Sequence, residues 1–440
     1  MYLGAPTVII PALRRNDSDA VSDAMASLIS SGCSYGTIPW NFILPVLLST
    51  FGRRRTFLFV NCALIITSVI FYISDSPNQL LIFEIITGLP HSGTVTVAVI
   101  ILAEYTSPKY RGMFLMTKSA SIHWGIWVSN VIGTFFSWRY IAVVGFLCSL
   151  YTLTAFFWPE SPFWLANKGR FNECKRSHRW LKGNGEFSKK ELDNLLNYQN
   201  YENLTIRNGN IFRFFRTISS REFYKPIFVI TLCVCLYIFS GKLVCSIYAI
   251  DIFKRITKND SAAYTGMLIL DGATVFSMYV GCLLCRFLKR RTLLLCSATV
   301  SILFLFTISL YLFLVKLSLL VENAFLSIAL LGCYSFSVGC GPTIMATSLY
   351  AELVPLRHKS LSVVLVSIIF MSLLATSLNI APFIFKSFGM HGTFLFYGIC
   401  MSIFTILVFW FLPETKDKTL IEIDQYFKGE EKLQNKRTDS

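Results

Sequence analysis

The chain has 440 residues, of which 54% are hydrophobic and 15% charged, and its formal net charge is +15. Soluble globular proteins have roughly 45–50% apolar and about 25% charged residues, so this composition excludes an ordinary soluble domain. A basic surplus indicates a nucleic-acid partner only in a soluble protein. In an apolar chain its meaning depends on where the charges fall, and we expect no nucleic-acid partner here.

Apolar runs of about 20 residues, the length needed to cross roughly 30 Å of hydrocarbon as a helix, recur along the chain. Residues 1–13 are too short to span a membrane and lack a charged leader, so we interpret them as the outer end of a first helix whose beginning is absent. The sequence therefore predicts an all-α membrane protein. Its eleven expected complete spanning segments lie at 26–49, 56–73, 78–104, 112–135, 138–158, 226–250, 262–287, 292–315, 323–352, 360–386 and 392–412.

A long polar stretch separates the spanning segments into two groups. Ser161 and Pro162 open this stretch with a hydroxyl that can cap free N–H groups and a proline suited to the first helical position. Short amphipathic helices are therefore expected there. The predicted domains are an N-terminal helical half with an incomplete first helix (1–158), a linker with short amphipathic helices (159–225), a C-terminal six-helix half (226–412) and a tail (413–440).

Lysines and arginines determine the expected orientation. One side of the membrane would hold the loop at 53–55, the linker and the tail, and it would carry 30 of the 40 basic residues. The other side would carry 8, while Lys118 and Lys242 lie within helices. Because basic loops stay on the inner side, we expect the linker and the C-terminus to be cytoplasmic, in a multi-pass protein of the plasma membrane.

Three short signals occur once in each half and in the same order. Each pair marks the same helix ends of a six-helix unit, which indicates that the chain is two copies of one unit. Parallel repeats of this kind are typical of one large transporter fold. The pairs are "FGRRRT" (51–56) with "LKRRT" (288–292), "AE" followed by "RG" (103–112) with "AE" followed by "KS" (351–360), and "PES" (159–161) with "PET" (413–415).

Five motifs give the chain a resemblance to a known family. They are "GRRRTF", "AEYTSPKYRG", "PESPFWL", "GCGPTIMATSLYAELVPLR" and "LPETKDKTL". Together they resemble the sugar porter branch of the major facilitator superfamily, and within it the facilitated trehalose transporters of arthropods. The resemblance covers nearly the whole chain. It implies a major facilitator fold of two six-helix halves and transport of a sugar, such as trehalose or a hexose, by alternating access.

The resemblance also implies a cytoplasmic gate made of charge pairs between the halves. An exposed pair contributes only about 0–1 kcal/mol, so such pairs can bias the halves and still break during transport. The alternative is that these are ordinary charges at the membrane interface. The expected acidic members are Glu104, Glu160, Glu352 and Glu414, and the basic members are Arg53, Arg54, Arg111, Arg290, Arg291 and Lys359.

The chain departs from the family at the positions that contact substrate. Where the seventh helix of sugar porters has two glutamines and an asparagine, residues 237–243 are "YIFSGKL". Amides offer sugar hydroxyls both donors and acceptors, so their loss requires other groups. His123 is either a proton site or a histidine hydrogen-bonded within the bundle. The candidate substrate-binding residues are Ser119, His123, Asn130, Tyr237, Tyr248 and Asn379.

Three charged residues fall inside the spanning segments, namely Glu84, Lys242 and Asp271. A lone charge near the middle of a membrane costs about 2.5–3.5 kcal/mol on insertion scales, so such residues face the bundle and find partners. Lys242 and Asp271 lie at similar depth on consecutive helices, which favours an ion pair between them. The alternatives are that each faces an aqueous cavity separately, or that Glu84 is the partner of Lys242.

The sequence therefore favours a transporter for a small polar solute, with a sugar as the first expectation. A carrier for a charged or less polar solute is one alternative, and a transport-inactive sensor or scaffold is another. No nucleophile–base pair, metal cluster or phosphate-binding loop stands out in the sequence, so we expect no enzyme activity, no cofactor and no metal site. The expected partners are the solute and the lipid bilayer, and the oligomeric state is left open.

Overall fold

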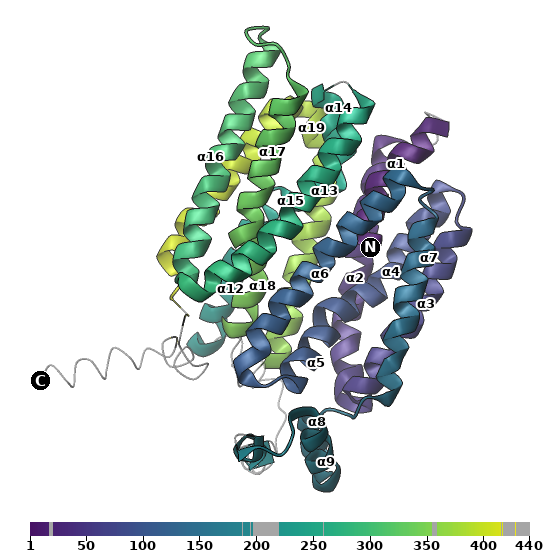
Figure 1. Ribbon diagram of the computed structural model, residues 1–440, viewed down its shortest axis with the longest axis vertical. Coiled ribbons are helices and arrows are strands. Elements are labelled where there is room, and N and C mark those ends of the chain that lie inside the picture. The colour runs from purple at the N-terminus through teal and green to yellow at the C-terminus, as the bar shows by residue number, and fades with distance from the viewer. Residues whose placement is uncertain are drawn as a thin grey trace, which may run out of the picture.

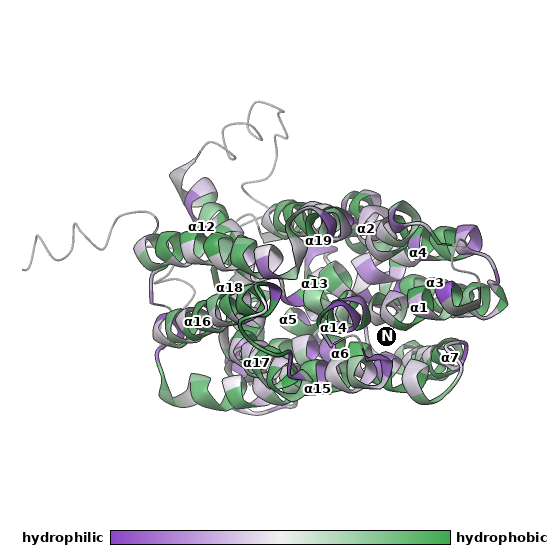
Figure 2. Ribbon diagram, turned by 90° about the horizontal axis from the view of Figure 1, so that it is seen from above, coloured by the Kyte–Doolittle hydropathy of each residue, from purple (hydrophilic) through white to green (hydrophobic). Residues whose placement is uncertain are grey.

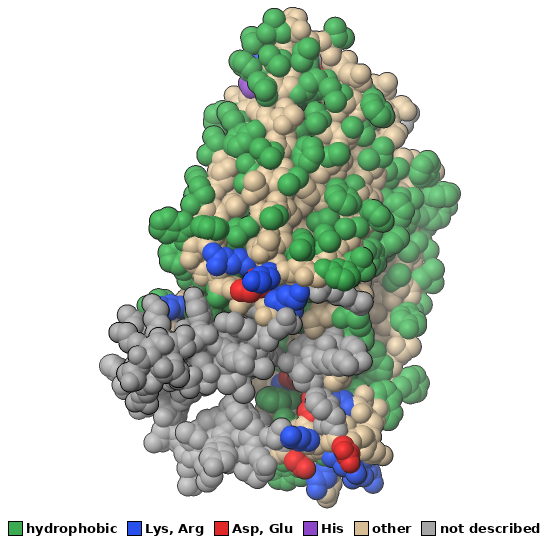
Figure 3. Space-filling model, turned by 60° about the vertical axis from the view of Figure 1, so that its left-hand side comes forward, with side chains coloured by type: hydrophobic (Ala, Val, Ile, Leu, Met, Phe, Trp, Pro, Cys, Tyr) green, Lys and Arg blue, Asp and Glu red, His purple; other side chains and the backbone are tan. Residues whose placement is uncertain are grey.

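The computed structural model describes residues 1–16, 21–186, 188–193, 195–196, 220–257, 259–353, 359–414, 416 and 427. Within these ranges the chain forms helices and no strands. Most of the helices stand side by side in one bundle (Figure 1). On the face that Figure 3 shows, hydrophobic side chains are spread along the side of the bundle, and most of the charged side chains that can be seen gather at one end of it.

The first half of the chain, here called the N-terminal half, runs from residue 1 to residue 157. Its short first helix packs against α6, where Val8 lies 2.4 Å from the place a Cβ would take on Gly133. Its elements are η1 (Tyr2–Gly4), α1 (Ala5–Asn16), α2 (Asp23–Phe51), α3 (Arg53–Ile73), α4 (Pro77–Ser92), η2 (Gly93–Val97), α5 (Ala98–Tyr105), α6 (Pro108–Phe135), α7 (Tyr140–Thr152) and η3 (Leu153–Phe157).

The C-terminal half begins at α12, and α12, α16 and α17 lie on the side of the bundle away from α3, α4 and α7 (Figures 1 and 2). Gly389, with φ of 69°, interrupts its last helix and separates the two spans expected there. The elements are α12 (Arg221–Ile238), α13 (Lys242–Ile247), α14 (Ala249–Thr257), α15 (Asp260–Phe287), α16 (Arg290–Lys316), α17 (Ala324–Val338), η4 (Gly339–Thr343), α18 (Ile344–Leu353) and α19 (Lys359–Phe411).

Eight helices among the described residues are long and apolar enough to cross a membrane. This confirms a multi-pass membrane protein. Eleven complete spans were predicted, and the difference has two sources. The stretch Leu361–Phe411 counts once although it holds two predicted spans. The helices α2 and α6, which carry many Ser, Gly and Asn residues, are not among the eight.

Two short helices, α8 (Pro162–Asn167) and α9 (Phe171–Lys182), lie below the bundle in Figure 1. Ser161 caps α8 as predicted, because its hydroxyl accepts a hydrogen bond from the N–H of Trp164 at 3.4 Å. Buried Leu165 and Cys174 belong to the small core that joins the two helices. The end of the bundle beside α8 and α9 is called the basic end below, and the end at α14 the opposite end.

The span expected at 226–250 is present as Phe223–Ile247, but it is broken rather than one continuous helix, and the sequence analysis did not predict the break. The chain breaks between α12 and α13 at Gly241, whose φ of 78° lies in the left-handed region that favours glycine. The ring of Tyr397 lies 2.8 Å from the place where a Cβ would stand on Gly241. A larger residue there would meet both backbone strain and this ring, so the break depends on glycine.

The fourth span of each half contains a short π-helical segment at a corresponding place, η2 in one and η4 in the other. In each segment a glycine lets a neighbouring helix approach closely. A Cβ on Gly93 would stand 2.3 Å from Val60 of α3, and one on Gly341 would stand 1.6 Å from Ser297 of α16. Since α3 and α16 are also corresponding helices, the structure repeats the same packing device in both halves.

The contact between α2 and α4 depends on two glycines that let the backbones meet. A Cβ on Gly88 would stand 2.2 Å from the backbone of Gly36. We therefore expect Gly88→Ala to destabilise the protein by about 1–3 kcal/mol through overpacking. The measurement is the melting temperature of the purified protein in detergent. Gly112→Ala is the matched control, because nothing lies within 4 Å of its added Cβ, and a melting temperature lowered equally in both variants would contradict this packing.

Candidate functional site

A cavity of about 120 Å³ lies between the two halves, within the bundle. Its walls come from both halves: α4, η2, α5 and α6 on one side, and α12, α13, η4, α18 and α19 on the other. Aliphatic side chains form most of the lining. The volume is below the roughly 300–1,000 Å³ of typical ligand pockets, so a bound solute would have to widen it.

Three of the six predicted substrate-binding residues, Ser119, His123 and Tyr237, line this cavity. His123 interacts through Nδ1 with the carbonyl oxygen of Ser119 at 3.3 Å, while its buried Nε2 has no hydrogen-bond partner among the described residues. The ring of Tyr237 stacks on Phe370, with 6.3 Å between ring centroids. These three side chains are therefore placed where a solute in the cavity could touch them.

The other three predicted residues are not among the described residues that line the cavity, and the side chain of each donates a hydrogen bond to another residue of the protein. The side-chain amide of Asn130 donates to Asp271 at 2.6 Å. The hydroxyl of Tyr248 donates to the carbonyl of Leu378 at 3.1 Å. The amide of Asn379 donates to Ser31 of α2 at 3.3 Å. Contact between any of these three groups and a solute would require the bundle to rearrange.

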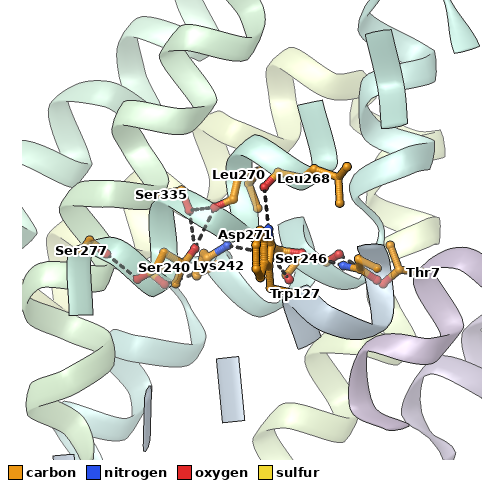
Figure 4. Close-up of polar contacts among 12 residues, drawn as sticks. Thr7, Trp127, Ser240, Lys242, Ser246, Leu268, Leu270, Asp271, Ser277 and Ser335 are labelled. Atoms are coloured by element: carbon orange, nitrogen blue, oxygen red, sulfur yellow. Dashed lines mark hydrogen bonds and ion pairs between the residues drawn. The ribbon is translucent and has the colours of Figure 1, made fainter. Parts of the chain in front are cut away.

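The ion pair expected from the sequence is present between Lys242 and Asp271, with 3.4 Å between Nζ and Oδ1. Their side chains are only 1% and 4% exposed. The hydroxyl of Ser246 donates to the same carboxylate at 2.5 Å (Figure 4). Asn130 donates to its second oxygen. Glu84 is buried elsewhere, against Gly32 of α2, and so is not the partner of Lys242.

Several hydrogen bonds between the halves lie toward the opposite end. Asn130 of α6 and Asp271 of α15 belong to different halves. So do Trp127 and Leu268, which are joined by an indole hydrogen bond of 3.2 Å (Figure 4). Thr7 also donates to the carbonyl of Ser246, at 3.3 Å. These bonds hold the two halves together on the side of the cavity that faces the opposite end.

A looser contact between the halves lies farther out. Arg14 forms an ion pair with Asp23, and it also lies 4.0 Å from Asp251 of α14. Burial raises the pKa of the Asp251 carboxyl, and the neighbouring Arg14 counteracts part of that shift. The carboxylate is therefore held in a partly desolvated place where a cation from the other half stabilises its charged form.

At the basic end, the predicted gate residues form a compact cluster within the N-terminal half. Arg53 makes a bidentate ion pair with Glu104, with distances of 2.9 and 2.8 Å. Glu160 accepts hydrogen bonds from the backbone N–H groups of Arg53, Arg54 and Ser161, at 2.8, 3.1 and 2.9 Å. A carboxylate at free N–H groups of a helix start is favourable, because the helix dipole is positive there.

The same arrangement recurs in the C-terminal half, where Glu414 accepts from the backbone N–H groups of Arg290 and Arg291 at 3.1 and 3.2 Å. These described contacts differ from the prediction, since they join elements of one half rather than two halves. The reason is geometric. The sixth helix of each half ends beside the start of the third, so its carboxylate reaches the nearest free N–H groups. The side chains of Arg111, Glu352 and Lys359 lie outside the described residues.

Two sets of residues at the site were not predicted from the sequence. Lys118 and His91 line the cavity but were not expected to contact a solute, and Ser246 was not expected to donate to Asp271. The position of Lys118 inside an apolar helix was a usable signal, because intramembrane charges mark functional sites. Ser246 gave no such signal, since a serine in an apolar helix is common and its hydroxyl usually bonds the helix backbone.

The buried pair leads to a testable expectation. Removing one member leaves the other charge buried without its counter-ion, which costs several kcal/mol, whereas removing both leaves no buried charge. Lys242→Met and Asp271→Leu should each lower surface expression strongly, and the double variant should recover a large part of it. Expression is measured by surface biotinylation. A double variant as poor as the sum of the singles would show that the pair does not stabilise the protein.

The chain is similar to known proteins in sequence and in structure. The family model described as sugar (and other) transporter matches residues 7–427. A facilitated trehalose transporter of Apis mellifera ligustica is 23% identical over 385 residues, 86% of this chain and 74% of that protein. The facilitated trehalose transporter of Bombyx mori is 26% identical over 86% of this chain and 74% of its own length. The sugar transporter ERD6 of Arabidopsis thaliana is 25% identical over 84% and 74%.

Among solved structures, the proton:xylose symporter XylE bound to 6-bromo-6-deoxy-D-glucose superposes with a TM-score of 0.77 and 16% identity, over 97% of this chain and 96% of that one. XylE of E. coli in an inward-open conformation gives 0.74 and 14%, over 97% and 95%. These structures show the major facilitator fold, as predicted. The family model that matches residues 7–427 shows that the chain belongs to the sugar (and other) transporter family.

Proposed function

We propose that this chain carries a sugar across the plasma membrane by alternating access. The observation that supports it best is a cavity lined by both halves, with hydrogen bonds between the halves on its side toward the opposite end. Rocking one half against the other would expose such a cavity to the two sides in turn. Relatives that are named as trehalose and sugar transporters support a sugar as the solute.

The direction in which the cavity faces follows from the same contacts. It is lined by Leu115 and Lys118 near the start of α6 and by Val366 near the start of α19, and both helices start at the basic end. The bonds between α6 and α15 close it toward the opposite end. We propose that the structure is in the state that faces the basic end, and the excess of Lys and Arg supports a cytoplasmic position for that end.

Within this proposal the domains keep the predicted roles: 1–158 and 226–412 are the moving halves, 159–225 is the cytoplasmic linker and 413–440 the tail. Glu160 and Glu414 hold the end of each half together and make it rigid. In this proposal the gate between the halves is formed by Arg111, Glu352 and Lys359. In the cavity, Ser119, His123 and Tyr237 contact the solute, whereas Asn130, Tyr248 and Asn379 seal the opposite end.

Uptake of labelled trehalose and glucose by cells that produce the full-length protein tests this function. We expect uptake above that of cells without it. Ser119→Trp should abolish uptake, because the indole would fill a cavity of about 120 Å³. Ser121→Trp is the matched control, since Ser121 is on the same helix but exposed on its outer face. Equal uptake by both variants at equal surface expression would remove the cavity from the transport path.

Glycan mapping tests the orientation. Three Asn-x-Ser/Thr sequons occur, at Asn16, Asn259 and Asn203. Asn16 ends α1 and Asn259 caps the start of α15, both at the opposite end, whereas Asn203 belongs to the linker and lies outside the described residues. Because glycans are added on the outer side, we expect mass spectrometry to find them on Asn16 or Asn259 only. A glycan on Asn203 would reverse the orientation.

A further inference from the structure

We propose that Glu84 is a proton-binding site and that the protein moves a proton together with each sugar. This inference rests on the proposed transport function and names the ion that is coupled to it. Lys242 and Asp271 neutralise each other inside the bundle, whereas Glu84 stands apart from that pair, between α2 and α4.

The carboxyl of Glu84 is buried without a counter-ion. Only 2% of the residue is exposed. It packs against α2, where its Cβ lies 3.1 Å from the place that a Cβ would take on Gly32. Among the described residues its carboxyl makes no hydrogen bond, and no basic group lies within 4.0 Å of it. An unpaired carboxylate inside a membrane is very unfavourable, so this group is stable there with a proton bound.

The titratable groups around Glu84 do not form an ion pair with it. The amino group of Met1 and the thiol of Cys33 are the groups that face it, and neither is bonded to its carboxyl. Tyr2, on η1, donates its hydroxyl to Ser68 at 2.6 Å. The carboxyl can therefore gain and lose a proton, because no salt bridge holds it in the charged form.

Glu84 lies midway between the opposite end and the cavity. The helix α4 starts at the opposite end with Pro77, and Glu84 follows seven residues later, roughly 10 Å along the axis at 1.5 Å per residue. His91, which lines the cavity, follows after another seven residues. Seven residues make about two turns of helix, so Glu84 and His91 project from the same face of α4.

The residues along this face connect Glu84 with the cavity. Cys33 follows Gly32, the residue against which Glu84 packs, and its Sγ lies 3.2 Å from Nδ1 of His91. Chains of acidic side chains and histidines carry protons in membrane transporters. In the described state the O–H bond of Glu84 would break, and the proton would pass by way of His91 to water in the cavity. The carboxylate would take up a new proton from water when the halves part at the opposite end.

The experiment uses the full-length protein reconstituted in liposomes, with labelled glucose and labelled trehalose as solutes and a pH-sensitive dye in the lumen. Adding sugar without a pH gradient should acidify the lumen, because a proton enters with each sugar. An outer solution more acidic by about two pH units should raise the accumulation of the transported sugar up to about 100-fold, if one proton moves with each sugar.

Glu84→Gln keeps the size of the side chain and removes the proton site. It should abolish the acidification and the effect of the gradient, while exchange of labelled for unlabelled sugar continues, because exchange needs no net movement of protons. Glu84→Asp retains an acid and should retain part of the acidification. Asp75→Asn is the matched control, since Asp75 lies just before α4 but its side chain is 73% exposed.

Two results would overturn the inference and leave sugar transport intact. The first is sugar uptake by the unaltered protein without acidification and without an effect of the gradient, a readout that needs no variant to fold. The second is acidification that is equal in Glu84→Gln and in the unaltered protein. Uptake of neither sugar under any condition would overturn the proposed function, and this inference with it.

Discussion

The arrangement of the two halves depends on one carboxylate buried in the membrane. Asp271 holds partners from both halves, with Lys242 and Ser246 on its own side and Asn130 on the other. A carboxylate in this place cannot lose all of its partners, because an unpaired buried charge is very unfavourable. When the halves separate at the opposite end, the Asp271 carboxylate loses only one of these partners, Asn130. The ion pair stays within the C-terminal half, so the charge remains compensated while the bundle opens.

The carboxylates at the basic end act differently, since they make each half rigid. Glu160 and Glu414 lie at the ends of corresponding helices and bond backbone N–H groups at the starts of α3 and α16. Backbone groups do not change rotamer, so these bonds fix the helix ends more firmly than a pair of long side chains would. Two rigid halves joined by a few breakable bonds match the rocking of repeats that this fold uses.

Much of the fold was predictable, because the length of an apolar run and the motifs at helix ends can be recognised from neighbouring residues in the sequence. The break in the seventh span was not predictable, since residues 226–250 form one long and largely apolar run, and the break depends on Gly241 meeting the ring of Tyr397, more than 150 residues later in the chain. The site was predictable only in part. A polar residue in a membrane helix can serve a solute or the protein, and the sequence did not tell Asn130, which bonds Asp271, from His123, which lines the cavity.

The departures from the family pattern can be understood together. Amide side chains suit neutral hydroxyls, since each amide donates and accepts. Residues 237–243 contain none of those amides, and the polar side chains that line the described cavity include Ser119, His123 and Tyr237 instead. Hydroxyl and imidazole groups also donate and accept hydrogen bonds, so they offer a solute the same kinds of contact from other positions. The fold of two halves is thus shared with the solved transporters, whereas the polar groups that face the cavity stand at different places in it.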